Sequence, residues 1–321
     1  MPRKISMSDL DLKKEIQKLK QETDTVILAH NYQIPQVQDV ADFVGDSLNL
    51  SRQAVRVKEE NILFCGVHFM AETAAIISPE KNVFIPDLEA GCSLSDSITI
   101  QQLREWKDSH PGAITVGYVN TTAEIKSELD YCCTSSNAIH VVNAIPKEKE
   151  ILFLPDMFLG AYVAKMTNRD NMKIWAGECH VHAGITPDVV REKLAQLSNP
   201  EFIIHPECSC TTPILYDTVA NGYGQQTINI LSTEGMVKHV RESTAQNFLI
   251  ATETGILHRM RQENPKKTFA AASDEAECKY MKMITLEKVY DSILRGQYQV
   301  TIPKDIADKA RLSIQRMLEL G

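Results

Sequence analysis

The 321-residue sequence has no apolar run approaching 18 residues, the length that a membrane-spanning helix needs. It also has no excess of positive charge, because 34 lysines and arginines stand against 42 aspartates and glutamates, for a net charge of -8. Surfaces that bind nucleic acids concentrate lysine and arginine, so this dispersed negative charge disfavours them. We therefore expect neither a membrane nor a nucleic acid as a partner.

The N-terminal segment lacks the apolar core that is typical of a signal peptide. Leu12, Ile16 and Leu19 fall instead at helical spacing and predict an amphipathic helix that docks on the rest of the chain. The eight cysteines include no CxxC pair and follow no secretion signal. This usage is typical of a reducing compartment, where thiols act as metal ligands or nucleophiles, so we expect a cytoplasmic protein.

Short motifs recur three times along the chain at intervals of roughly 90 residues. Cys92, Cys179 and Cys278 close the similar segments "EAGC", "AGEC" and "EAEC", 87 and 99 residues apart. Polar pairs that follow apolar runs keep the same rhythm: His30 and Tyr32, Tyr118 and Asn120, His205 and Glu207. A third set consists of hydroxyl residues: Ser47, Ser135, and Ser232 with Thr233. This period is too long for a solenoid unit but suits a compact domain, so the sequence predicts a triplicated chain.

Apolar runs alternate with helical segments throughout the sequence, as in parallel sheets that are buried on both faces. The runs predicted as strands are residues 25–30, 61–66, 82–86, 113–119, 139–143, 150–155, 172–177, 201–206, 226–232, 247–252 and 267–273. The prediction is an α/β protein with three pseudo-symmetric α/β/α sandwich domains around a central pseudo-threefold axis. The expected domains are 1–105 with the N-terminal helix, 106–195, and 196–321 with the C-terminal helices. Residues 300–320 should form a closing helix with Pro303 near its start.

Ligands of such sheets lie beyond the carboxyl ends of the strands, so the three cysteines should meet near the axis. Zinc prefers four protein ligands, or adds histidine or carboxylate at a catalytic site. A 4Fe-4S cluster held by three cysteines would leave one iron open as a Lewis acid. Burial as a small hydrophobe is the alternative for any single cysteine. It is the better interpretation of Cys65, and joint ligation is not expected of the remaining four: Cys132, Cys133, Cys208 and Cys210.

The histidines differ in how they are placed. His30 and His205 end strands at equivalent positions of two repeats, which favours a function. His180 and His182 follow Cys179 and either orient the site or fix a loop. No partner is apparent for the others, which are expected to be structural or solvated: His110, His140, His239 and His258. Met70 and Glu72 suit either a channel to the cluster or ordinary helix packing.

Several motifs together resemble the quinolinate synthase family: "AHNYQ", "VGDSL", "GVHFMAETA", "PDLEAGCSLSD", "YVNTTAEIKS", "CTSSNA", "HPEC" and "STEGM". They run in order from His30 to Cys278. The resemblance implies the three-domain fold and a 4Fe-4S cluster on Cys92, Cys179 and Cys278. It also implies a transferase of NAD biosynthesis, which condenses iminoaspartate with dihydroxyacetone phosphate to quinolinate and releases phosphate and water. A transient contact with the enzyme that produces iminoaspartate is a further expectation.

That resemblance assigns roles to the recurring residues. Glu207, Tyr32 and His30 are the expected catalytic residues. Hydroxyl groups and N–H groups at helix starts would bind phosphate and carboxylates. The expected substrate-binding residues are His30, Ser47, Tyr118, Asn120, Ser135, His205, Glu207, Ser232 and Thr233. Some relatives carry an extra cysteine pair before the third ligand, but "SDEAECKYMKM" has only Cys278, so no redox switch is expected there.

Two other functions remain open. A hydro-lyase acting on a hydroxy acid would also use a cluster with an open iron, but would not need the phosphate-binding serines. A non-catalytic iron-sulfur redox sensor normally uses four cysteine ligands and has no use for His30, Tyr32 and Glu207. A radical enzyme dependent on adenosylmethionine is disfavoured, because its three cysteines lie together in one loop.

Overall fold

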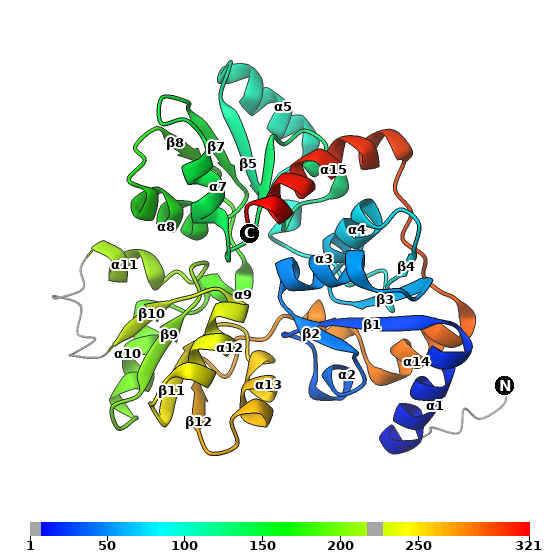
Figure 1. The fold of residues 1–321 in the computed structure, drawn as a ribbon. Coiled ribbons are helices and arrows are strands. Elements are labelled where there is room, and N and C mark those ends of the chain that lie inside the picture. The colour runs from blue at the N-terminus through cyan, green and yellow to red at the C-terminus, as the bar shows by residue number, and fades with distance from the viewer. Residues whose placement is uncertain (1–7, 217–226) are drawn as a thin grey trace.

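The computed structural model describes residues 8–216 and 227–321, which contain three four-stranded sheets (Figure 1). The first contains β1 (Thr25–His30), β2 (Phe43–Gly45), β3 (Asn61–Cys65) and β4 (Asn82–Phe84). The second contains β5 (Ile114–Tyr118), β6 (Tyr131–Cys133), β7 (Ile151–Leu154) and β8 (Met172–Ile174). The third contains β9 (Glu201–Ile204), β10 (Ile228–Ile230), β11 (Asn247–Ala251) and β12 (Thr268–Ala271). The predicted α/β class is therefore confirmed, with one sheet for each repeat of the motifs.

All three sheets have the same connectivity. Their strand orders are β2-β1-β3-β4, β6-β5-β7-β8 and β10-β9-β11-β12, and every pairing between named strands is parallel. The first strand of each set therefore lies between the second and the third. All six residues of β1 are buried. Such strands read as continuous apolar runs because both faces of the sheet are covered.

The helices lie between and around the sheets. Those of the first part are α1 (Asp9–Glu22), α2 (Pro35–Gln38), α3 (Ser47–Arg56) and α4 (His68–Ile77). The middle part contributes α5 (Ile100–Ser109), α6 (Ala123–Lys126), α7 (Ala138–Ala144), α8 (Met157–Thr167), α9 (His180–Ala183) and α10 (Pro187–Ala195). The last part contributes α11 (Thr211–Tyr216), α12 (Thr233–Glu242), α13 (Ile256–Glu263), α14 (Leu286–Arg295) and α15 (Lys304–Glu319). None of the described helices combines the length and the apolar character needed to cross a membrane.

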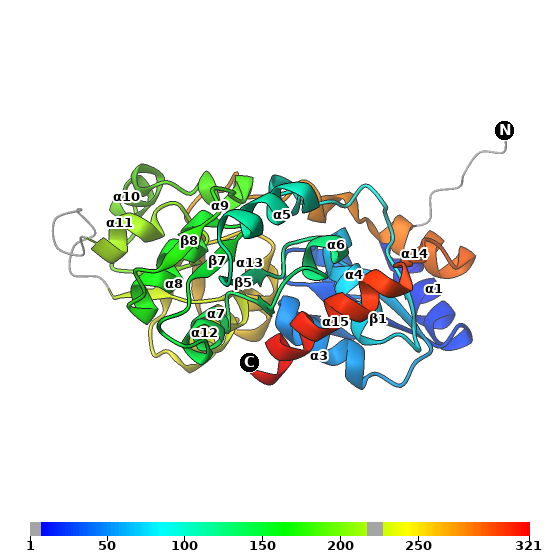
Figure 2. The same cartoon turned by 90° about the horizontal axis from the view of Figure 1, so that it is seen from above.

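The three α/β units surround a common centre in Figure 1, and the turned view in Figure 2 shows them in one flattened layer. The two terminal helices predicted from the sequence are present. Leu12 and Ile16 of α1 are buried, and Pro303 is the N-cap of α15. Helix α14 packs against α1 and β3, and α15 packs against α4, α6 and β6. The C-terminal helices thus cover the first two sheets, and the predicted boundaries 1–105, 106–195 and 196–321 stay a prediction.

One predicted strand is wrong. Residues 139–143 lie inside helix α7, where Val141 and Val142 are buried. A short apolar run with β-branched residues has no periodicity that separates a strand from a buried helical turn. Strands β2 and β6 were not predicted, because each has only three residues and is followed directly by polar residues, whereas the three-residue strands β4, β8 and β10 continue into further apolar residues. These two edge strands turn out to position part of the site.

Candidate active site

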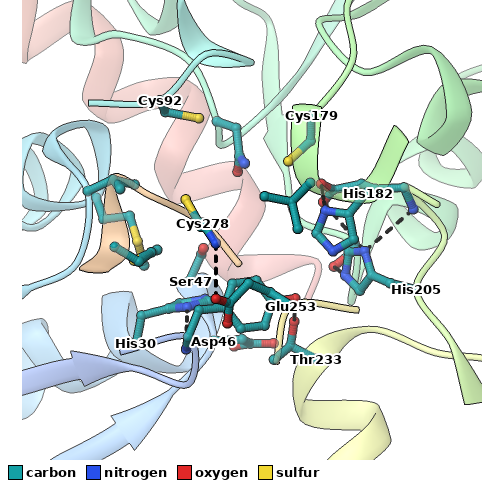
Figure 3. Close-up of a pocket in the computed structure, with 18 of the residues that line it drawn as sticks. His30, Asp46, Ser47, Cys92, Cys179, His182, His205, Thr233, Glu253 and Cys278 are labelled. Carbon is teal, nitrogen blue, oxygen red and sulfur yellow. Dashed lines mark hydrogen bonds and ion pairs between the residues drawn. The ribbon is translucent and has the colours of Figure 1, made fainter. Parts of the chain in front are cut away.

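The carboxyl ends of strands from all three sheets converge on one pocket (Figure 3). Residues of each recurring motif set line it, so the three repeats contribute to a single site. The predicted site residues that line the pocket are His30, Tyr32, Ser47, Cys92, Tyr118, Asn120, Ser135, Cys179, His205, Glu207, Thr233 and Cys278. Ser232 does not line it.

The three cysteines lie in the loops that follow β4, β8 and β12, and their sulfur atoms face the same part of the pocket (Figure 3). Burial raises the pKa of all three thiols, to about 12 for Cys92. Backbone N–H groups of the following residues point at the sulfurs of Cys92 and Cys278, which favours thiolates. Burial therefore opposes the thiolate form, which a bound metal would stabilise.

The pocket residues are compatible with two kinds of metal site. Among residues 8–216 and 227–321, the ligand atoms of Cys179, His182 and Glu207 all lie within 4.8 Å of one another, which is close enough for a single ion. Thiolates that bind different irons of one cluster lie farther apart than the ligands of a single ion. Three cysteines on three separate loops of the same pocket therefore fit a 4Fe-4S cluster.

Glu207 is the centre of a buried polar group beside the cysteines. Tyr118 donates a short hydrogen bond to its Oε1, and His182 Nδ1 lies 3.3 Å from its Oε2. Burial opposes ionisation of Glu207, but the nearby rings of His205 and His182 and the hydrogen bond from Tyr118 outweigh it and lower the pKa to about 2. Glu207 is therefore a buried carboxylate that is ionised at neutral pH.

The three histidines of the pocket fall into two kinds. Burial lowers the pKa of His30 and of His205 to about 3, so both are neutral imidazoles at pH 7. Burial also lowers the pKa of His182, but the neighbouring Cys179 and Glu207 favour its charged form more strongly and raise the pKa to about 10. Its Nε2 lies 2.9 Å from Thr252 Oγ1, and its ring stacks on that of His205 with centroids 4.8 Å apart. The pocket thus combines neutral hydrogen-bonding rings with one basic ring next to the carboxylate.

Tyr32 reaches from the first unit into the third. Its hydroxyl oxygen lies 2.6 Å from Thr252 Oγ1 and 3.1 Å from Thr233 Oγ1. Burial raises the pKa of Tyr32 well above its ordinary value, so the phenol keeps its proton. The two threonine hydroxyls can hold the phenol in place and exchange a proton with it.

The hydroxyl residues stand at the starts of α3, α7 and α12, which follow the second strand of each sheet. Ser47 and Thr233 are the first residues of their helices, and Ser135 Oγ lies 3.2 Å from His205 Nε2. Ser232 caps α12 through the N–H of Gly235. Helix starts of this kind present N–H groups and positive partial charge to an anion.

The comparisons with known proteins agree with this site. Residues 14–319 match the family model described as quinolinate synthetase A protein. A quinolinate synthase from Mycobacterium sp. (strain KMS) is 52% identical over 307 residues, which cover 96% of this chain and 91% of that protein. One from Pyrobaculum aerophilum is 50% identical over 310 residues, covering 97% of this chain and 100% of that protein. A third, from Mycobacterium tuberculosis (strain ATCC 25618 / H37Rv), is 50% identical over 307 residues, covering 96% and 88%.

The chain belongs to the quinolinate synthetase A family. It is an enzyme. The resemblance seen in its motifs is thereby confirmed. The resemblance was based on the repeated residues. In this family member all of them except Ser232 line one pocket.

Sequence reasoning missed four polar residues that line the pocket of this family member or hold its side chains: Asp46, Thr134, Thr252 and Glu253. Each follows a second or third strand of its sheet within two residues. His30 and His205 were singled out because they are polar residues at the end of a strand. The same signal would have found these four residues if it had been applied to every strand of a repeat and not only to the first. For His182 the sequence left open whether it orients the site or fixes a loop, and the structure places it in the lining of the pocket.

Three of the other histidines have partners that were not apparent in the sequence, as expected of histidines with a structural role. His110 Nδ1 lies 2.9 Å from Glu150, His258 Nε2 lies 2.8 Å from Asp39, and His239 pairs with Glu201. These pairs join elements that are distant in sequence, which is why no local pattern revealed them.

The remaining expectations concern packing. Met70 lines the pocket, whereas Glu72 accepts a hydrogen bond from the N–H of Ala123 at 2.9 Å and so anchors α6. The cysteines outside the periodic trio are buried: Cys65, Cys132, Cys133, Cys208 and Cys210. Of these, Cys132 donates to Ser313 Oγ and Cys208 to the carbonyl of Ala251. None of the five lines the pocket.

Proposed function

We propose that this enzyme is a transferase of NAD biosynthesis that condenses iminoaspartate with dihydroxyacetone phosphate to quinolinate, releasing phosphate and water. One observation carries the proposal: a single pocket joins three cysteines, an ionised carboxylate with its proton-bearing partners, and hydroxyl groups at helix starts. The relatives named quinolinate synthase over nearly the whole chain support it. The expected place of action is the cytoplasm, with a transient contact to the enzyme that produces iminoaspartate.

The proposal includes a pseudo-threefold axis through the pocket. The identical strand order of the three sheets supports it, as does the recurrence of equivalent motifs at their strand ends. On this view, the three α/β/α sandwiches are copies of one ancestral unit, and each delivers one cysteine to the axis.

Cys92, Cys179 and Cys278 would hold a 4Fe-4S cluster. When bound there, the cluster supplies an iron without a cysteine ligand, which acts as a Lewis acid on a substrate oxygen or nitrogen. Val67, Phe69 and Val181 line the same pocket and provide apolar walls that limit the access of water.

The protein's own side chains would transfer the protons. Glu207 accepts the proton released from carbon during enolisation and returns one to the oxygen that leaves as water. Tyr32 and His30 are the further acid-base candidates, since Tyr32 is a protonated phenol and His30 a neutral imidazole. Tyr118 keeps its proton because burial and Glu207 raise its pKa well above the ordinary value, so it orients the carboxylate.

The other residues would bind the substrates. Asn120, His205 and Tyr118 offer hydrogen bonds from the strand ends, and the helix starts of α3, α7 and α12 receive the phosphate and the two carboxylates. The corresponding hydroxyl residues are Ser47, Ser135, Ser232 and Thr233. Positive partial charge at three helix starts compensates anionic groups without placing a lysine in the pocket.

The direct test is an anaerobic assay of the purified full chain. Iron and acid-labile sulfide are counted, and quinolinate is measured by chromatography after addition of both substrates. About four irons per chain together with quinolinate formation are expected. Cluster content without quinolinate formation would instead favour a hydro-lyase of a hydroxy acid or a redox sensor.

A second metal occupancy has its own support, because Cys179, His182 and Glu207 place their ligand atoms within 4.8 Å of one another. Such a trio suits a single divalent ion. The ion would share Cys179 with the cluster, so the two forms exclude each other. Metal analysis that finds one zinc and no sulfide would replace the cluster with this site.

Air is expected to inactivate the enzyme before it unfolds. A cluster with one iron that no cysteine holds can lose that iron, which leaves a three-iron form. Electron paramagnetic resonance and circular dichroism, followed together during exposure to air, check this order of events. Activity that persists in air while the cluster remains intact would contradict an exchangeable iron.

Ser232→Ala is expected to weaken substrate binding, with a smaller loss of kcat. The hydroxyl caps α12 and accepts a hydrogen bond from Ser136 at 3.0 Å, so its loss loosens the helix start that carries Thr233. Loss of a cap costs about 1 kcal/mol of stability. The check is the KM for dihydroxyacetone phosphate, with Thr285→Ala as the control, because Thr285 caps α14 away from the pocket. An equal rise of KM in both variants would assign the effect to general destabilisation.

A further inference from the structure

A buried carboxylate holds the main chain at the third cysteine. Glu253 follows β11, and its side chain is 0% exposed. Its Oε1 accepts a hydrogen bond from the N–H of Cys278 at 3.1 Å (Figure 3). Its Oε2 accepts one from the N–H of Gly255 at 2.7 Å. The carboxylate therefore fixes the cysteine residue itself rather than a distant part of its loop.

Lys282 extends this connection to the first unit. Its Nζ lies 2.7 Å from Glu253 Oε1 and donates to the carbonyl oxygen of Tyr32 at 2.7 Å. The N–H of Lys282 also donates to the carbonyl of Cys278 at 3.1 Å, so the lysine belongs to the same turn as the cysteine. One ammonium group thus joins the cysteine loop to the main chain of Tyr32.

The segment from Thr252 to Gly255 also fits closely against the Tyr32 loop. A Cβ atom on Gly255 would lie 2.8 Å from the carbonyl carbon and oxygen of Tyr32, so this position has no room for a side chain. Gln38 Nε2 donates to the carbonyls of Gly255 at 2.9 Å and Gln33 at 2.8 Å. Since Thr252 also contacts the Tyr32 hydroxyl, this segment holds both ends of the tyrosine.

We propose that Glu253 and Lys282 are positioning residues that set the Cys278 loop against Tyr32. Retention of the cluster and turnover then depend on the same ion pair, a dependence that rests on the proposed function. Removing Lys282 leaves the buried carboxylate uncompensated and breaks the contact with Tyr32, whereas removing the charge of Glu253 weakens the contact with Cys278, so each single change should disturb one side of the link. Outer groups that orient metal ligands typically change metal affinity or activity by about 10- to 100-fold when they are removed.

The test compares Glu253→Gln and Lys282→Met in the full chain, prepared without oxygen. Release of iron to a ferrous chelator is expected to be about 10- to 100-fold faster in Glu253→Gln. In Lys282→Met, kcat should fall by a similar factor while KM changes less, because Tyr32 is displaced but the anion-binding residues are not. Lys282→Arg keeps the charge and the donors and should restore most of both properties.

A third measurement needs neither cluster nor substrates. In cluster-free protein, alkylation of Cys278 by iodoacetamide, read by peptide mass spectrometry, should be faster in Glu253→Gln than in the wild type. The matched control is Glu277→Gln, the same change next to Cys278 at an exposed carboxylate. It should leave alkylation, iron release and kcat unchanged.

The proposal would be overturned if the rates of iron release and Cys278 alkylation in Glu253→Gln, and kcat in Lys282→Met, were equal to those of Glu277→Gln. If the wild type holds a cluster but forms no quinolinate, the proposed function fails, while iron release and alkylation still decide the role of the pair. If Glu253→Gln does not fold, the kcat of Lys282→Met decides it alone, because that variant keeps the hydrogen bonds that Glu253 accepts from the N–H groups of Cys278 and Gly255.

Discussion

Replacing Glu207 by glutamine is expected to lower kcat by about 100- to 10,000-fold, the range typical of a lost acid-base group. The amide has nearly the same shape and can still accept the hydrogen bond from Tyr118, so the fold should survive. It cannot take up a proton, and it carries no charge to pair with His182, which lies 3.3 Å from the carboxylate. Cluster content and binding of dihydroxyacetone phosphate should therefore persist while turnover collapses.

The measurement is kcat and KM under anaerobic conditions, together with iron content and equilibrium binding of dihydroxyacetone phosphate. Glu201→Gln is a matched control, because Glu201 is likewise a carboxylate paired with a histidine, His239, but is less buried and lies at the start of β9, outside the pocket. Near-normal turnover in Glu207→Gln would move the acid-base role to Tyr32 or His205. The proposed mechanism would then be wrong for Glu207.

Replacing any one of Cys92, Cys179 or Cys278 by serine is expected to abolish cluster binding and activity. Each sulfur comes from a different unit, and a serine oxygen is a poor replacement for a thiolate on iron. Iron and sulfide counting on anaerobically prepared protein checks this. Full cluster content in Cys179→Ser would contradict the assignment.

Serine variants of the five buried cysteines are the controls, and they should keep the cluster: Cys65, Cys132, Cys133, Cys208 and Cys210. Cys208→Ser is the most stringent, because residue 208 follows Glu207 and a serine can still donate to Ala251. The cysteine trio also separates the two metal forms. Zinc that binds equally well to the wild type and to Cys92→Ser, but not to Cys179→Ser, would favour the single-ion site over the cluster.

The sequence by itself determined the three repeats, most of the strands and the residue types that meet in the pocket. Repeated motifs at strand ends are local signals, and parallel strands bring their carboxyl ends to one edge of a sheet. The sequence alone was therefore enough to predict that Cys92, Cys179 and Cys278 lie near one another. Strands β2 and β6 were missed because neither lies in a longer apolar run, and helix α7 at 139–143 was mistaken for a strand because so short an apolar segment carries no usable periodicity.

Only the tertiary structure decided which side chains act on one another. Tyr118 donates to Glu207 across 89 positions, and Tyr32 meets Thr252 across 220. These contacts depend on how the three units pack, which no local pattern encodes. The same packing lowers the pKa of Glu207 and raises that of His182, because burial and neighbouring charges act through space rather than along the chain. It also places Glu253 and Lys282 between Cys278 and Tyr32, a link that joins the third unit to the first and is therefore invisible within either repeat alone.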